Sequence, residues 1–187
     1  VLKYPEAINR VVLINGFHSG LMWQANCDSY NQYAKTHFPE QWKKVDSLRS
    51  LGYVSSDPVF SKAYGSFPVK YVYYHNTKLK QPMPEKVQRS WNSEVYYSIV
   101  GIDADFQVTG SMGEIDFRKK LKSVKAPTLV IAGRYDGVST PEYAIQYKYF
   151  MPQAQFEMFE EIGHNPYLEE PEKFFPLLES FLGLAKK

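Results

Sequence analysis

Short runs of β-branched and aliphatic residues recur along the chain and predict buried strands. They occupy residues 10–15 (RVVLIN), 128–133 (TLVIAG) and 154–161 (AQFEMFEE). Continuous apolar runs such as the first two are typical of buried parallel strands, whereas the third alternates enough to suggest a sheet edge. Amphipathic helices are expected at 117–127, 140–152 and 170–184. Strands that alternate with helices predict a parallel sheet with both faces covered, and hence an α/β fold.

The pattern is different between about Leu21 and Ile115. Trp, Tyr, Phe, Lys and Gln are mixed there without strand alternation, and prolines 39, 58, 68, 82 and 84 interrupt the segment. Short amphipathic helices started by Asp or Pro are predicted at 27–38, 39–53 and 84–101. We interpret residues 21–115 as a mainly helical insertion, with residues 1–20 and 116–187 forming the α/β core.

Composition narrows the classes of function. The 187 residues, 44% of them hydrophobic, are enough for one packed domain with an insertion. Charges of both signs are dispersed at a net +2, which gives no basic face for nucleic acid, and no apolar stretch approaches the ~20 residues of a membrane span. The four histidines are scattered, so neither a metal site nor a cofactor is expected. A single cysteine, Cys27, excludes an internal disulfide and favours a cytoplasmic location; we expect it to be a small buried hydrophobe.

Two polar side chains follow successive predicted strands. Asp136 comes three residues after the second strand, and His164 comes five residues after the third if that strand ends at Phe159. The carboxyl ends of parallel strands share one rim of the sheet, so we expect both residues there. A buried carboxylate accepts the Nδ1 proton of a catalytic imidazole and stabilises the imidazolium that forms. Each residue alone has a simpler interpretation, a turn for Asp136 and packing for His164, but the ordered pair favours a catalytic dyad.

These segments resemble a known family. APTLVIAGRYDGVSTP and EIGHNPYLEEPEKF are similar to the C-terminal half of an α/β-hydrolase. NSEVYYSIVGIDADFQVTG followed by DFRKKLKSVKAPTLVIAGRYD resembles the proline iminopeptidase branch. The resemblance extends from Tyr4 onward and is weakest from about Leu21 to Pro84. It implies that the three strands are strands 6–8 of eight, and that residues 21–115 are the cap over the catalytic rim.

In this family the triad order is Ser, acid, His, with the serine on a G-x-S-x-G turn between a strand and a helix. That motif is absent here, because GFHSG, GSMG and GVSTP each depart from it. We interpret Ser19, Ser111 and Ser139 as ordinary loop serines. The nucleophile is therefore expected on a missing N-terminal segment or on a partner chain, which would also supply the strand beside residues 10–15.

The resemblance also implies a substrate. Proline iminopeptidases hold the substrate's free α-amine with acidic side chains, and Asp105 fills the place of one of them, while Gly137 stands where a second would be. Tyrosines 71, 73, 74, 96 and 97 are expected in the cap core, some of them lining an aromatic pocket. The expected function is a serine hydrolase of small amide, peptide or ester substrates. The alternatives are epoxide hydrolase or esterase chemistry, or a non-catalytic binding protein of the same fold.

Overall fold

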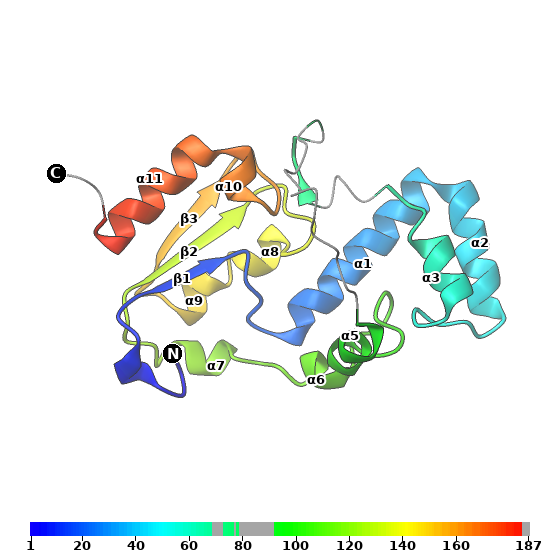
Figure 1. The fold of residues 1–187 in the computed structure, drawn as a ribbon, viewed down its shortest axis with the longest axis horizontal. Coiled ribbons are helices and arrows are strands. Elements are labelled where there is room, and N and C mark those ends of the chain that lie inside the picture. Colours follow the sequence, from blue (N-terminus) through cyan, green and yellow to red (C-terminus); the bar gives the residue numbers. More distant parts are fainter. Residues whose placement is uncertain (69–72, 77, 79–91, 185–187) are drawn as a thin grey trace. The chain divides into compact units, whose positions relative to one another are not determined.

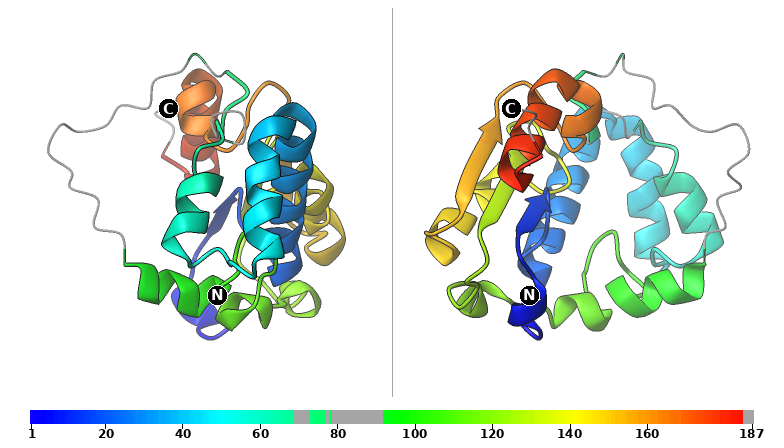
Figure 2. Two further views of the ribbon diagram at one scale, coloured as in Figure 1. Left: turned by 90° about the vertical axis from the view of Figure 1, so that its right-hand side faces the viewer. Right: turned by 60° about the vertical axis from the view of Figure 1, so that its left-hand side comes forward.

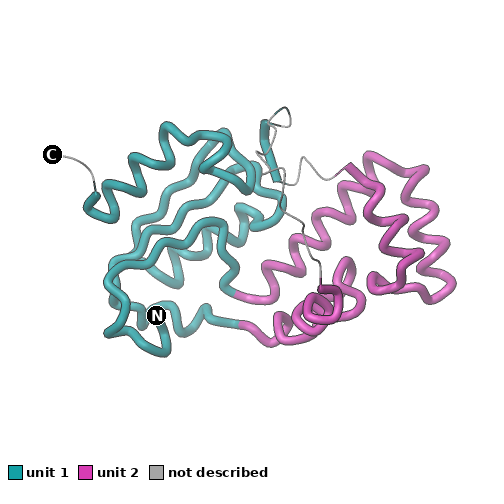
Figure 3. Tube along the Cα trace, viewed as in Figure 1, with its two compact units in different colours: residues 1–18, 70–80, 116–187 teal, residues 19–69, 81–115 magenta. Residues whose placement is uncertain are grey.

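The computed structural model of the protein describes residues 1–68, 73–76, 78 and 92–184. The chain folds into two compact units (Figure 3). Unit 1 comprises residues 1–18, 70–80 and 116–187, and unit 2 comprises residues 19–69 and 81–115. Tyr71, Pro82, Pro84 and the first part of the predicted helix 84–101 lie outside the described residues.

Unit 1 is built on three parallel strands in the order β1-β2-β3. The strands are β1 (Val11–Ile14), β2 (Thr128–Gly133) and β3 (Gln155–Phe159). Val11 lies opposite Thr128, and Leu129 lies opposite Gln155. The predicted parallel sheet is thus confirmed. The third strand is shorter than predicted at its end, because the chain turns at Glu160, whose carboxylate accepts hydrogen bonds from Arg134 beyond the end of β2.

Helices cover both faces of this sheet (Figures 1 and 2). On one face Leu129 and Ile131 of β2 pack with Phe159, Ile162 and Phe174, the last from α11 (Pro171–Leu182). On the other face Val130 packs with residues from α7 (Arg118–Leu121) and α9 (Tyr147–Phe150). Every residue of β2 is buried, which explains its continuous apolar sequence. The described residues of the unit also include the short helices η1 (Pro5–Ala7), α8 (Pro141–Ala144) and α10 (Pro166–Glu169).

Two of the predicted helices of unit 1 are wrong in extent. The helix expected at 117–127 instead ends at Leu121. The last residues of the expected helix lead into Pro127, and a proline disfavours helical geometry at the residue before it, here Ala126. The helix expected at 140–152 divides into α8 and α9, because the amides of Gln146 and Lys148 bond three residues back rather than four. The closing helix runs from Pro171 to Leu182, close to the prediction.

Unit 2 is mainly helical in its described residues. It contains α1 (Gly20–His37), α2 (Pro39–Ser50), α3 (Pro58–Tyr64), α5 (Ser93–Val100) and α6 (Gly110–Gly113). A largely aromatic core, formed by Ala34, Trp42, Val45, Phe60 and Phe67, joins α1, α2 and α3, and Phe106 packs against it. Helix α1 begins seven residues before the predicted start, since extended backbone at Ser19 leads directly into the buried Gly20 and Met22. Cys27 is buried as expected.

Candidate active site

Asp136 is fixed by the loop that carries it. The loop leaves β2 at Gly133, and the Asp136 side chain is fully buried. Its Oδ1 accepts hydrogen bonds from the backbone amides of Val138 at 2.7 Å and Ser139 at 2.8 Å. Two backbone donors hold the carboxylate in one orientation.

His164 meets this carboxylate with its Nδ1 atom. The distances from Nδ1 are 3.0 Å to Oδ2 and 3.2 Å to Oδ1 of Asp136. The expected contact between the two residues is therefore present. Nδ1 donates to the carboxylate in the tautomer that leaves the Nε2 lone pair available to accept a proton. The imidazole side chain is 26% exposed, so it is accessible although its partner is not.

The backbone of His164 is held on both sides. Its amide donates to the carbonyl of Tyr73 at 2.8 Å, and its carbonyl accepts from Nδ2 of Asn15 at 2.6 Å. Asn15 follows β1 on the same rim and adopts a left-handed backbone with φ of 48°, which Asn tolerates better than most residues. Asn15 was missed from the sequence, although a polar residue at the carboxyl end of a predicted strand was a signal equal to the one at Asp136.

The close approach of the two loops requires a glycine. A Cβ added to Gly133 at the end of β2 would overlap the carbonyl oxygens of Ile162 and Gly163. Any larger residue at this position would push the His164 loop away from the Asp136 loop.

The three candidate serines have structural contacts or lie in short helices. The Ser139 hydroxyl is buried and donates to the Gly16 carbonyl at 3.4 Å. Ser19 precedes α1, and Ser111 lies in the short helix α6, not in a loop as expected. In the ranges that the structure describes, no serine hydroxyl is hydrogen-bonded to His164. The same ranges contain no cluster of side chains suited to hold a metal ion.

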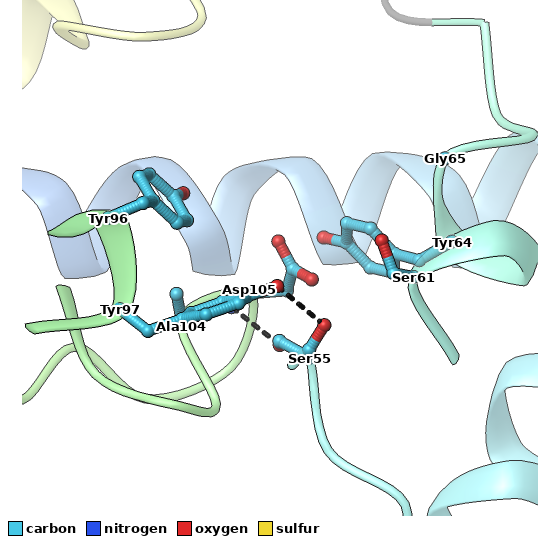
Figure 4. A pocket seen from close by; sticks show the side chains of 8 residues that line it. All are labelled: Ser55, Ser61, Tyr64, Gly65, Tyr96, Tyr97, Ala104 and Asp105. Carbon is cyan, nitrogen blue, oxygen red and sulfur yellow. Dashed lines mark hydrogen bonds between the residues drawn. The ribbon is translucent and has the colours of Figure 1, made fainter. Parts of the chain in front are cut away.

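Unit 2 contains a separate polar cavity of about 200 Å³. It is lined by Ser55, Ser61, Tyr64, Gly65, Tyr96, Tyr97, Ala104 and Asp105. The Asp105 carboxylate points into the space between Tyr64 and Tyr96 (Figure 4). Burial raises the pKa of Asp105 to about 6, and a hydrogen bond with Ser55 opposes part of this increase. Asp105 is thus a carboxylate in a confined site with a raised proton affinity.

An ion pair holds the segment that carries Asp105. Nη1 and Nη2 of Arg49 donate to the two carboxylate oxygens of Asp103, at 2.7 and 2.9 Å. The guanidinium also lies 4.3 Å from the centre of the Phe106 ring. Ser55 links this pair to the cavity, because its hydroxyl lies 3.3 Å from Asp103 Oδ1 and accepts from the Asp105 amide at 2.9 Å. Nothing in the sequence pairs Arg49 with Asp103, and this contact was missed.

The predicted tyrosines divide between the two units. Tyr96 and Tyr97 line the cavity of unit 2, together with Tyr64, which was not among the tyrosines expected there. Tyr73 and the buried Tyr74 belong instead to unit 1. The described ranges contain no helix that is both long and apolar enough to cross a membrane.

Comparison with known proteins places the chain among proteins of the alpha/beta hydrolase fold. A family model described as alpha/beta hydrolase fold matches residues 1–171. A proline iminopeptidase of Heyndrickxia coagulans is 32% identical over 183 residues, covering 97% of this chain and 60% of the relative. A proline iminopeptidase of Clostridioides difficile (strain 630) is 26% identical, covering 95% of this chain and 58% of the relative.

Solved structures show the same fold. The proline iminopeptidase of Mycobacterium smegmatis superposes with a TM-score of 0.67 at 22% identity, over 97% of this chain and 59% of that one. VinJ superposes with a TM-score of 0.64 at 18% identity, over 98% of this chain and 60% of that one. The chain spans about three fifths of the length of the relatives it matches. With a parallel sheet covered on both faces and a family match over most of its length, the chain belongs to the alpha/beta hydrolase fold family.

Proposed function

We propose that this chain supplies the acid and the base of a Ser-Asp-His triad in a hydrolase of small amide, peptide or ester substrates. The observation that carries the proposal is the contact of His164 Nδ1 with the buried Asp136 carboxylate. In this role Nε2 of His164 accepts the proton of a serine hydroxyl and later delivers it to the leaving group. Asp136 keeps the imidazole in the required tautomer and stabilises its charged form. No cofactor takes part.

The nucleophile, in this proposal, lies on a segment outside these 187 residues, either N-terminal to them or on a partner chain. The outer edge of β1 supports this, because no other strand pairs with it among the described residues. Ile14 of β1 is 38% exposed although all of β2 is buried. Asn15 Oδ1 is buried and has no hydrogen-bond partner in the described ranges. A neighbouring strand would cover the edge and could donate to this oxygen.

The substrate we propose carries a free amine. Asp105 is an acidic side chain in a cavity with tyrosine walls, which is a suitable environment for an ammonium group. The proline iminopeptidases named above support an aminopeptidase role by similarity. Gly137 contributes no second carboxylate, so amine selectivity rests on Asp105 alone. We retain a cytoplasmic location as part of the proposal, based on the single thiol of Cys27.

Epoxide hydrolase chemistry is the less favoured alternative. It would use tyrosine hydroxyls of the cap as acids, yet the Tyr64 hydroxyl donates to Asn31 Oδ1 at 2.6 Å and the Tyr97 hydroxyl donates to the Ser55 carbonyl at 3.0 Å. Both are committed to contacts within unit 2. A non-catalytic role would require a residue other than a nucleophile at the missing position, and Asp136 and His164 would then have no chemistry to perform.

Labelling with a serine-directed fluorophosphonate tests the proposal. The protein is purified with whatever co-purifies, labelled, and mapped by mass spectrometry. We expect the label on a serine outside these 187 residues, and we expect His164→Ala to abolish it while the matched exposed variant His37→Ala leaves it intact. Stoichiometric labelling of Ser19, Ser111 or Ser139 would show that the nucleophile lies within this chain.

A further inference from the structure

Residues 73–76, which we call the strap, contact both loops of the Asp136–His164 pair. They belong to unit 1, although in sequence they lie about 60 residues before Asp136. Their contacts are therefore not a consequence of chain connectivity, and they do not form part of the triad as proposed above.

The strap is joined to the His164 loop by one backbone hydrogen bond and by the side chain of Glu169. The Tyr73 carbonyl accepts from the His164 amide at 2.8 Å. Glu169 then connects the two segments, because its Oε1 accepts from the Gly163 amide at 2.7 Å and its Oε2 accepts from the Asn76 amide at 3.0 Å. One carboxylate thus satisfies a donor of each segment with charge-assisted bonds.

Gly163 makes this approach possible. A Cβ at position 163 would lie 2.8 Å from the Tyr73 carbonyl oxygen and 3.0 Å from the His75 amide nitrogen. These contacts are with backbone atoms, which cannot rotate away as a side chain can. The glycine before His164 is therefore required by the strap.

The strap also contacts the loop of Asp136. The His75 ring stacks on Tyr135, the neighbour of Asp136, with ring centres 3.8 Å apart and an angle of 14° between the planes. His75 Nε2 lies 3.3 Å from a carboxylate oxygen of Glu161, at the start of the loop that leads to His164. The strap thus contacts the two loops at separate points.

We propose that Glu169 is a positioning residue for His164, which it holds against Asp136 through the Gly163 amide and the strap. This inference rests on the proposed function, because it holds that the contact between His164 and Asp136 serves proton transfer. His164 can accept a proton productively only if its ring stays oriented toward Asp136, and a displacement of about 1 Å in such a group costs up to roughly 100-fold in rate. Glu169 does not touch the reacting atoms and acts through the backbone that carries the imidazole.

The variant that tests this is Glu169→Gln in the complete enzyme. The amide keeps the shape of the side chain but turns an NH2 group toward a backbone N–H, so one of the two bonds is lost. Glu172→Gln is the matched control, because Glu172 is exposed in the first turn of α11. We expect kcat to fall about 10- to 100-fold in Glu169→Gln with KM within about twofold, and no change in the control.

A measurement independent of turnover separates this inference from the proposed function. The Nδ1 proton of His164 gives a downfield NMR resonance when it is held in the bond to Asp136. We expect this resonance in the parent and in Glu172→Gln, and its loss or broadening in Glu169→Gln. Its absence from the parent would contradict the proposed triad. Its presence in the parent together with an unchanged signal and kcat in Glu169→Gln would overturn the positioning role alone.

A second variant covers the case in which Glu169→Gln folds poorly. Gly163→Ala places a methyl group against the Tyr73 carbonyl and so displaces the strap while Glu169 itself is unchanged. We expect the same loss of kcat and of the Nδ1 resonance. A folded Gly163→Ala enzyme with parental kcat would equally overturn the inference.

Discussion

Replacing Asp105 by Asn should stabilise unit 2 while removing the proposed amine contact. Burial raises the pKa of this carboxyl from 3.8 to about 6. The folded state therefore binds the proton more tightly than the unfolded state, and the stability that this adds is lost as the pH rises from 3.8 to about 6. At about 1.4 kcal/mol per pKa unit, the difference corresponds to about 3 kcal/mol at pH 7.

The net gain should be smaller than this upper value. Asp105 is half-buried rather than fully buried, and Asn interacts less strongly with the Ser55 hydroxyl than a carboxylate does. We expect Asp105→Asn to raise the free energy of unfolding by about 1–2 kcal/mol at pH 7. The gain should shrink to within about 0.5 kcal/mol at pH 4, where the folded parent is already protonated at this position.

Urea unfolding followed by tryptophan fluorescence measures this quantity. All three tryptophans lie in the residue ranges of unit 2, so the signal follows that unit. Asp46→Asn, at an exposed position of α2, is the matched control and should stay within about 0.5 kcal/mol of the parent at both pH values. A loss of stability in Asp105→Asn at pH 7, or a gain of equal size at pH 4, would show that ionisation of Asp105 does not weaken the folded state.

Three further predictions concern activity, packing and reactivity. The ratio of kcat/KM between a free-amine substrate and its N-acylated analogue should fall as the pH drops below about 6, because Asp105 is protonated there. In Asp105→Asn the ratio should not depend on pH. If the variant kept the pH profile of the parent, amine binding by this residue would be contradicted. Arg49→Lys should lower the stability of unit 2 by about 1–2 kcal/mol in the same urea assay, since Lys keeps the charge but loses the bidentate geometry toward Asp103 and the stacking on Phe106. Burial raises the pKa of Cys27 to about 12, so a thiol reagent at pH 8 should label it only after unfolding, and rapid labelling of the folded protein would show the site to be open.

The central strand could be predicted from sequence because its burial is continuous. Every side chain of β2 is buried, and the run from Thr128 to Gly133 has the predicted limits. The ends of the helices could be predicted less well, because they depend on backbone hydrogen bonds that the pattern of apolar residues does not reveal. The division between α8 and α9 arises from amides that bond three residues back, and nothing in residues 140–152 marks this.

In the candidate site, residues next to strand ends could be predicted from the sequence, whereas contacts between residues far apart in the sequence could not. Asp136 and His164 could be found because each follows a strand directly and the rim of a parallel sheet brings strand ends together. Glu169 and Asn76 are 93 residues apart, and Arg49 and Asp103 are 54 apart. Their side chains have many partners of opposite or complementary character in the sequence, so only the fold selects the pair that meets.

The contacts around His164 bear on how the proposed enzyme is assembled. Asp136 holds the imidazole, while Asn15, Tyr73 and Glu169 hold the backbone on either side of it, and all four belong to unit 1 of this chain. None of these contacts needs the segment that would carry the serine. The proposed base and its carboxylate are therefore already oriented within this chain, so the proposed nucleophile-bearing segment would have only to bring a hydroxyl to Nε2 and a strand to the edge of β1. Preorganisation of this kind lowers the reorganisation required when a nucleophile arrives, whether it comes from the same polypeptide or from a partner.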